Sequence, residues 1–293
     1  MLSRRVFLVL ACFAAAVCAW PAEAPAQSKL KVVASFSILG DLVHQIGGDR
    51  VEVTTLVGPN GDAHAYSPTP ADSAKIQQAD LVAINGISFE MWADRLVKAA
   101  SYKGARLVAS RGIRALRAGG RPDPHAWQDV QNVKLYVANI RDALIGIDPA
   151  GAADYQARAT AYLAELDELD AEIKKAFEAI PKARRKAITS HDAFTYFGDA
   201  YGVVFHSPQG ISTDAAASSR GVAALIKQIK AEGIRAVFVE NMTNQRIIEQ
   251  IAKETGVKIG GTLYSDALSS GPPADTYIDL MRHNTRLLAA AMQ

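Results

Sequence analysis

The sequence predicts an α/β protein with two (β/α) lobes and mainly parallel sheets, joined by one long helix. Two observations support this prediction. Strand-like runs alternate with helical runs on both sides of residues 149–181, and such alternation is typical of parallel sheets. Residues 149–181 carry the longest uninterrupted helical signal of the chain. We therefore divide the chain into a signal peptide (1–26), an N-terminal α/β lobe (27–148), a linking backbone helix (149–181) and a C-terminal α/β lobe (182–293).

The first 26 residues have the composition of a secretory signal peptide. Arg4 and Arg5 form a positive start, Val6–Val17 is almost wholly apolar, and small residues precede Gln27. The apolar run is too short for a comfortable membrane span. The segment also resembles a twin-arginine export signal, although its strongly apolar stretch favours the general secretory route. We expect cleavage after residue 26 and a periplasmic protein.

Both cysteines of the chain, Cys12 and Cys18, lie within this leader, and neither follows a convincing lipoprotein cleavage sequence. The mature chain would therefore contain no cysteine. The whole sequence is 49% hydrophobic and 21% charged, with a formal net charge of +2. A charge so close to balance gives no reason to expect binding to nucleic acid or to an anionic membrane surface.

The elements of the N-terminal lobe are expected in a regular order. Leu30–Phe36 is an apolar run typical of a buried strand, and Val51–Val57 alternates in polarity. Gly47 and Gly48 end the helix between these two strands. Strands are expected at residues 30–36, 51–57, 80–84 and 106–109. Helices are expected at residues 39–46, 71–78, 90–100 and 130–145, and loops at residues 58–70 and 119–129.

The linking helix is predicted from a stripe of apolar or small residues spaced three or four positions apart. The stripe consists of Tyr155, Ala159, Tyr162, Leu166, Leu169, Ile173, Ala176 and Ile180. Asp148 is expected to cap the helix, Pro149 suits its first position, and Pro181 prevents its continuation. About 30 residues at about 1.5 Å each give a rod of roughly 45 Å. Such a helix could also pack inside one domain, which remains the alternative.

The alternation of strands and helices restarts after Pro181, which predicts the second lobe. Strands are expected at residues 186–190, 203–206, 236–240 and 258–264. Helices are expected at residues 194–201, 219–232, 245–255 and 276–291.

Four polar residues occupy positions suited to a ligand site. His64 and His125 lie in loops of the first lobe, whereas His191 and Asp266 each follow a strand of the second lobe. Ligands of open α/β sheets collect at the carboxyl ends of the strands. If the two lobes face each other there, three imidazoles and one carboxylate form a four-ligand set for a transition metal. Their spacing alone leaves open that each histidine is an ordinary surface residue.

The local motifs around these residues are more specific. Residues 61–70 (GDAHAYSPTP), 123–129 (DPHAWQD), 190–197 (SHDAFTYF) and 264–269 (YSDALS) resemble the metal-binding motifs of the cluster A-I (cluster 9) solute-binding proteins of zinc and manganese ABC importers. The resemblance covers essentially the whole mature chain. It implies two (β/α) lobes with mainly parallel sheets joined by one long rigid backbone helix, and one metal ion in the cleft. The metal ligands that it implies are His64, His125, His191 and Asp266.

The resemblance also implies a role. We expect a periplasmic solute-binding protein that captures Zn(II) in the interlobe cleft and delivers it to the permease of an ABC importer. The partner is then a membrane permease, a periplasmic metallochaperone stays open as a further partner, and we expect a monomer that binds no nucleic acid. We do not expect an enzyme. A secreted zinc hydrolase is the less favoured alternative, because four protein ligands leave no open position for water and no HExxH motif is present.

The choice of metal rests on the ligand set. Three imidazoles and one carboxylate suit Zn(II) better than Mn(II), which prefers more oxygen ligands. Many manganese-binding members of the family have a glutamate where this chain has His191. The chain also lacks the histidine-rich loop of many zinc-binding members, since no other histidine lies between His64 and His125. Mn(II) remains the alternative, and Asp266 could bind it through both oxygens.

Supporting residues are also expected around the ligands. Metal-bound imidazoles usually donate their second N–H to a carboxylate or carbonyl group, and four carboxylates are candidates. These candidates are Asp62, Asp123, Asp192 and Glu240. Trp127 and Tyr66 are expected to shield the site rather than to bind metal. The three remaining histidines are expected to lie outside the site; they are His44, His206 and His283.

Overall fold

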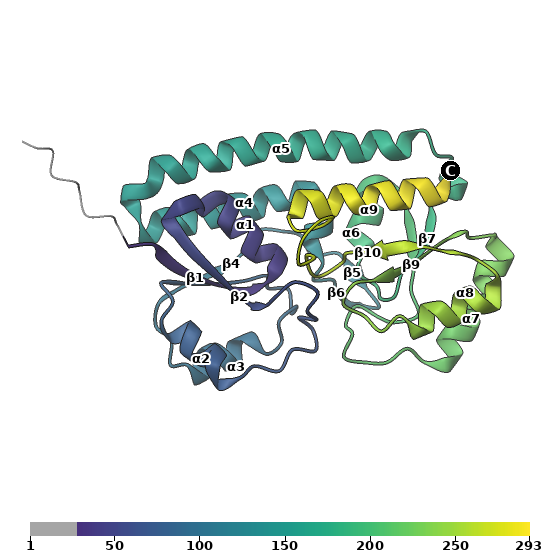
Figure 1. Cartoon of the computed structure of the whole chain (residues 1–293), viewed down its shortest axis with the longest axis horizontal. Coiled ribbons are helices and arrows are strands. Elements are labelled where there is room, and N and C mark those ends of the chain that lie inside the picture. Colours follow the sequence, from purple (N-terminus) through teal and green to yellow (C-terminus); the bar gives the residue numbers. More distant parts are fainter. Residues whose placement is uncertain (1–27) are drawn as a thin grey trace, which may run out of the picture.

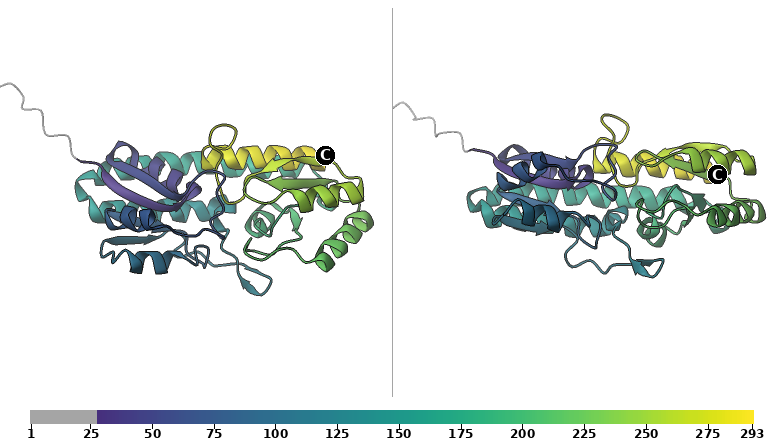
Figure 2. Two further views of the ribbon diagram at one scale, coloured as in Figure 1. Left: turned by 60° about the horizontal axis from the view of Figure 1, so that its bottom comes forward. Right: turned by 90° about the horizontal axis from the view of Figure 1, so that it is seen from below.

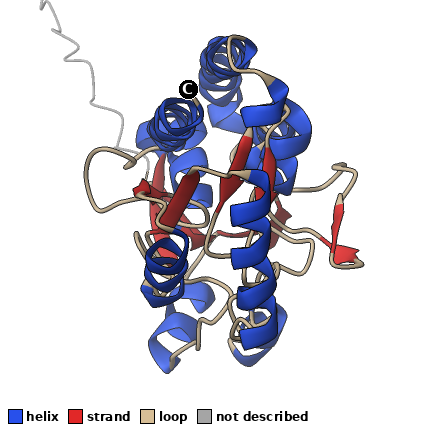
Figure 3. Cartoon of the chain, turned by 90° about the vertical axis from the view of Figure 1, so that its right-hand side faces the viewer, coloured by secondary structure: helices blue, strands red, loops and turns tan. Residues whose placement is uncertain are grey.

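The computed structural model describes residues 28–293, so the signal peptide expected at residues 1–26 lies outside the described part. Two α/β lobes lie side by side beneath one long helix, α5 (Figure 1). Seen end-on, the strands form a central layer with helices above and below it (Figure 3). The predicted fold class is therefore confirmed.

The first lobe is built on a four-stranded parallel sheet with the strand order β2-β1-β3-β4. Its strands are β1 (Leu30–Phe36), β2 (Val51–Val57), β3 (Leu81–Ile84) and β4 (Ala105–Val108). Its helices are α1 (Ser37–Gly47), α2 (Pro70–Gln77), α3 (Ala93–Ala99) and α4 (Val130–Ile147). The helices α1 and α4 lie between the sheet and α5, whereas α2 and α3 lie on the far side of the lobe (Figure 1). Strand β1 is buried along most of its length, as expected for a parallel strand covered on both faces.

The second lobe repeats this architecture with a parallel sheet in the order β10-β9-β7-β8. Its strands are β7 (Lys186–Ile188), β8 (Val204–His206), β9 (Ala236–Glu240) and β10 (Ile259–Leu263). Its helices are α6 (Thr195–Tyr201), α7 (Ser219–Glu232), α8 (Arg246–Thr255) and α9 (Tyr277–Met292). The expected elements are all present, with boundaries shifted by a few residues.

One element was not expected. A short antiparallel hairpin, β5 (Arg117–Ala118) and β6 (Arg121–Pro122), lies at the start of the stretch that the sequence predicts as a loop. Each strand is too short to show the alternation of apolar and polar residues that identifies a strand.

The linking helix α5 extends over Ala152–Glu178, which at about 1.5 Å per residue is a rod of roughly 40 Å. The residues before it, Pro149–Gly151, form a 3-10 turn instead of its first helical residues. The prediction that Asp148 caps the helix is wrong. Its carboxylate instead accepts hydrogen bonds from Arg50 at 2.7 Å and from the hydroxyl of Tyr155 at 2.8 Å, which anchors the start of α5 to the first lobe.

The predicted apolar stripe of α5 faces the body of the molecule. Tyr155, Ala159, Tyr162, Leu166, Leu169 and Ile173 are buried, as is Phe177, which the stripe omitted. The helix packs on α1 and α4 of the first lobe and on α9 of the second. It therefore packs on helices of both lobes.

The two lobes share one apolar core, which contains residues from both sheets and from α5. The start of α9 crosses to the first lobe: the Tyr277 N–H donates to Asp41 of α1 at 2.8 Å, and its hydroxyl donates to the carbonyl of Trp127 at 2.8 Å. A smaller, separate core lies under α7 and α8. Successive side chains of a strand point to opposite faces of the sheet, so one strand can contribute to both cores. Ala236 and Phe238 of β9 lie in the shared core, and Val237 lies in the smaller one.

Candidate metal centre

The four predicted ligands meet between the two sheets. His64 lies in the loop that follows β2, His125 in the loop that follows β6, His191 in the loop that follows β7 and Asp266 in the loop that follows β10. The strands of the two sheets point towards each other, so the loops at their carboxyl ends come together in the middle of the molecule (Figure 1). All four side chains are buried.

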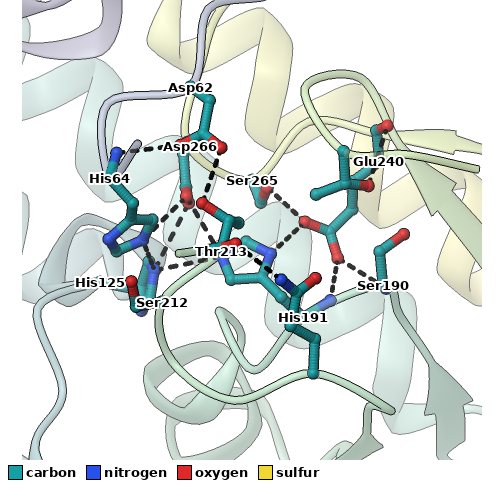
Figure 4. A network of polar contacts seen from close by, with 12 residues as sticks. Asp62, His64, His125, Ser190, His191, Ser212, Thr213, Glu240, Ser265 and Asp266 are labelled. Atoms are coloured by element: carbon teal, nitrogen blue, oxygen red, sulfur yellow. Dashed lines mark hydrogen bonds and ion pairs between the residues drawn. The ribbon is translucent and has the colours of Figure 1, made fainter. Parts of the chain in front are cut away.

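The side chains of the four residues point towards one another (Figure 4). The Nε2 atom of His125 lies 3.2 Å from Nε2 of His64 and 3.4 Å from Nε2 of His191. The Oδ2 atom of Asp266 lies 3.3 Å from Nε2 of His64 and 3.1 Å from Nε2 of His191. The Oδ1 atom of Asp266 lies 3.6 Å from Nε2 of His125. One ligand-type atom from each residue therefore lies within 4.8 Å of the other three.

The carboxylate of Asp266 is fully buried, and among the described residues no group other than the three imidazoles faces its oxygens. A buried carboxylate needs a positive partner, which here is either a proton on an imidazole or a cation bound by the four residues. The donor set of three nitrogens and one carboxylate suits a transition-metal cation.

Two carboxylates orient the imidazoles from behind. The Oδ1 atom of Asp123 lies 2.7 Å from Nδ1 of His125 and also accepts the N–H of His125 at 2.9 Å. The Oε2 atom of Glu240 lies 2.5 Å from Nδ1 of His191 and accepts the hydroxyl of Ser265 at 2.6 Å. A carboxylate at Nδ1 fixes the ring and leaves Nε2 for the metal. The expectations for Asp123 and Glu240 agree with this geometry.

The other two candidate supports do not contact an imidazole. The Oδ1 atom of Asp62 accepts the backbone N–H of His64 at 2.9 Å, and its Oδ2 atom accepts the hydroxyl of Thr213 at 2.6 Å. Asp62 therefore shapes the loop that carries His64 and ties it to the second lobe. The carboxylate of Asp192 instead accepts a long hydrogen bond from the hydroxyl of Thr195 at 3.5 Å.

Aromatic rings cover the inner side of the cluster. Trp127 packs at 5.3 Å from the ring of His125, as expected, but Tyr66 packs on Trp92 and donates its hydroxyl to Asp72. The prediction that Tyr66 shields the site is therefore wrong. Phe89, which lies in none of the four metal-binding motifs, packs edge-on against His64 at 4.7 Å. The remaining histidines, His44, His206 and His283, lie outside the cluster, as expected.

The charges within the cluster set the protonation of the histidines. Burial opposes a charge on His125, but the carboxylates of Asp266 and Asp123 outweigh it and raise the pKa of His125 to about 9. Burial likewise opposes a charge on His191, yet Glu240 and Asp266 hold its pKa well above the ordinary value. Burial disfavours the Asp266 carboxylate, but His191 and His125 hold its pKa well below the ordinary value. At neutral pH the metal-free cluster therefore carries protons that a metal must displace.

Metal affinity should consequently fall steeply as the pH is lowered. A bound imidazole must be neutral, and the free His125 is protonated below its raised pKa of about 9, so each displaced proton costs about tenfold in affinity per pH unit. Competition titrations with a chelator between about pH 6 and about pH 8 measure this slope. Unperturbed histidines would place the fall near pH 6.5 instead, with little change above it. A constant affinity over the whole range would exclude these imidazoles as ligands.

Two parallel-sheet lobes, a long helix across both and a buried three-histidine, one-carboxylate cluster between the strand ends define a metal-binding substrate-binding protein. Comparison with known families shows which family of such proteins the chain belongs to. Residues 32–291 match the family described as zinc-uptake complex component A, periplasmic, and the chain belongs to this family.

Relatives within this class carry different metals in their names. The manganese-binding lipoprotein MntA of Halalkalibacterium halodurans is 38% identical over 258 residues, which are 87% of this chain and 86% of that protein. The iron ABC transporter substrate-binding lipoprotein MtsA of Streptococcus pyogenes serotype M1 is 33% identical over 291 residues, 95% of this chain and 92% of that protein. The periplasmic zinc binding protein TroA of Treponema pallidum has a similar structure, with a TM-score of 0.87 and 29% identity over 90% of this chain and 99% of that chain.

These comparisons make the chain a metal-binding substrate-binding protein of an ABC importer, whose partner is a membrane permease. The expectation that it is not an enzyme is confirmed, since the relatives are transport proteins. Among residues 28–293, no helix is both long and apolar enough to cross a membrane.

Proposed function

We propose that this protein captures Zn(II) between its lobes, with His64, His125, His191 and Asp266 as the four ligands, and delivers it to the permease of its importer. The observation that supports this most strongly is the burial of four ligand-type atoms within 4.8 Å of one another. Transport is the fitting role, because four protein ligands leave no open position at which a catalytic zinc ion would activate water.

The dimensions of the cluster favour zinc. Zinc binds histidine nitrogen and carboxylate oxygen at about 2.0–2.2 Å, so neighbouring ligand atoms of a tetrahedral site lie about 3.3–3.6 Å apart. Five of the six residue pairs of the cluster approach to between 3.1 and 3.6 Å, and all four ligand-type atoms lie within 4.8 Å of one another. These separations are close to those of a tetrahedral zinc site, and three imidazoles match the preference of Zn(II) for nitrogen donors.

Mn(II) is the second candidate, and the placement of Asp266 favours it. Both oxygens of Asp266 face the imidazoles and no other group among the described residues, so the carboxylate can bind an ion through one oxygen or both. Binding through both would give five ligand atoms, which suits a cation that prefers oxygen. The relative from Halalkalibacterium halodurans is named as manganese-binding.

The remaining parts of the proposal concern the setting. We place the protein in the periplasm as a monomer, exported through a cleaved signal peptide at residues 1–26, and leave a metallochaperone open as a further partner. The relatives named above as lipoproteins raise membrane anchoring as the alternative to a free periplasmic protein. The size and lipid content of the protein recovered from its native cells would distinguish the two.

Metal analysis of the protein purified from its native periplasm tests the choice of metal. We expect about one zinc ion per chain when the cells are supplied with both metals, because the ligand set favours zinc. Competition titrations alone would be insufficient, since most nitrogen-rich sites bind zinc more tightly than manganese. Protein that contains manganese and shows no preference for zinc would overturn the zinc assignment and leave the rest of the proposal standing.

A further inference from the structure

The hairpin formed by β5 and β6 is the feature that the metal site leaves unexplained. Arg117 pairs with Pro122 and Ala118 with Arg121, and the two-residue turn is Gly119 and Gly120. Both glycines have positive φ angles, 56° and 77°, as a tight hairpin turn requires. The hairpin stands out from the body of the molecule in two further views (Figures 2 and 3).

This hairpin ends a strongly basic stretch of the first lobe. Residues 91–122 contain eight basic residues and one acidic residue, a net charge of +7 within a chain whose total is only +2. All eight basic side chains are exposed, and they are Arg95, Lys98, Lys103, Arg106, Arg111, Arg114, Arg117 and Arg121. The helix α5 has the opposite balance, with seven acidic and three basic residues. The stretch 91–122 therefore carries a net positive charge and α5 itself a net negative one.

The hairpin also lies beside the entrance to the metal cluster. A cavity of about 340 Å³ has His64 on its wall. Arg121 and Pro122 of the hairpin and Met91 line the same cavity from the first lobe, and Ile211, Ser212 and Asp214 line it from the second. Met91 is 75% exposed, a high value for a large apolar side chain. Any partner that takes metal from the cluster through this cavity would contact the hairpin.

The two arginines of the hairpin do not help to capture a metal, since they repel a divalent cation as it approaches. Among the residues that line the cavity, Arg121 is the basic one and Asp214 the acidic one. The two arginines are well placed for the surface that receives the metal. An opening that admits divalent cations must attract positive charge, so its surroundings are acidic. A projecting basic hairpin is complementary to such a surface, and charge complementarity fixes the orientation of two proteins.

We propose that the hairpin Arg117–Pro122 docks on an acidic surface at the outer entrance of the importer's permease. The two arginines supply the charge, and the exposed Met91 supplies an adaptable apolar contact beside them. This inference rests on the permease partnership of the family and not on which metal is bound. It places the entrance cavity over the opening that receives the ion.

Charge reversal at the hairpin tests the proposal. The double variant Arg117→Glu/Arg121→Glu should bind the purified permease, held in phosphatidylcholine nanodiscs, about tenfold more weakly than the natural protein. The salt dependence of binding should decrease as well, because the contact is electrostatic. The matched control is Lys175→Glu/Lys182→Glu, which makes the same change in charge at exposed positions on and beside α5. This control should change the affinity less than about twofold.

Two results would overturn the proposal. One is unchanged permease binding by the hairpin variant. The other is equally tight binding of the natural protein to vesicles of phosphatidylcholine and phosphatidylglycerol without permease, which would identify a lipid surface as the occupant. Zinc titration of the same preparations separates this test from that of the metal site, because among the described residues neither Arg117 nor Arg121 forms a hydrogen bond or ion pair with the four ligands. Permease binding can also be measured without metal.

Discussion

Replacement of His191 by alanine is expected to weaken Zn(II) binding by more than about a hundredfold. Loss of a residue that only hydrogen-bonds to a metal ligand already lowers metal affinity by about tenfold to a hundredfold, and loss of the ligand itself should have a larger effect. His191 is fully buried, and its Nε2 atom lies between His125 and Asp266. The variant leaves two imidazoles and one carboxylate around a cavity that the alanine does not fill. Titration against a chelator of known zinc affinity measures the loss.

The matched control is His44→Ala, which removes an exposed imidazole from α1, far from the cluster in the chain. Its zinc affinity should equal that of the natural protein. Circular dichroism of both variants shows whether the fold is kept, since His191→Ala also leaves Glu240 without its ring partner. A folded His191→Ala protein that titrates like the natural one would remove His191 from the metal site.

The substitution Glu240→Gln is expected to weaken zinc binding by about tenfold to a hundredfold without touching the metal. The carboxylate accepts four hydrogen bonds: from the N–H of Ser190, from the N–H and Nδ1 of His191, and from the hydroxyl of Ser265. A glutamine must turn its NH₂ group towards some of these donors. Buried donors without acceptors cost about 1–3 kcal/mol each, so the free energy of unfolding should also fall by about 2 kcal/mol or more.

The pH profile distinguishes positioning from general destabilisation. Glu240 is the largest contributor among the charges that raise the pKa of His191, so its replacement should lower that pKa and flatten the dependence of zinc affinity on pH. A purely structural effect would leave the slope unchanged. Glu249→Gln, at an exposed position on α8, is the control for loss of one carboxylate. If the folded Glu240→Gln protein bound zinc as tightly as the natural protein, Glu240 would not be needed to position His191.

The four clustered residues could be predicted because each lies where a strand ends or a loop begins, and motifs mark all four. Asp123 could also be found locally, since it precedes His125 by two positions. The contact of Glu240 with His191 spans 49 positions and depends on β9 and β7 being neighbours in the sheet. Strand order follows from tertiary packing and is not contained in the local pattern. The sequence therefore could not show that Glu240, and not the adjacent Asp192, would accept the hydrogen bond from the ring of His191.

The long helix shows the same limit. Its apolar stripe predicts which face is buried, but nothing in the stripe indicates what covers that face. The structure places α1, α4 and α9 against it, so the connection between the lobes is a layer of helices rather than one rod. Asp148 was expected to cap the helix because of its type and position, yet the cation of Arg50 and the hydroxyl of Tyr155 hold its carboxylate elsewhere.

The division of the interior into a shared core and a smaller one under α7 and α8 means that the chain does not consist of two equal folding units. Residues from both lobes depend on the shared core, so those parts of the lobes unfold together. The smaller core lies on the face of the second sheet that α7 and α8 cover, and we expect it to open before the shared core does. Amide hydrogens of α7 and α8 should exchange with solvent first, and proteolysis should begin there. The protein can loosen at this end while the loops beside the shared core stay ordered.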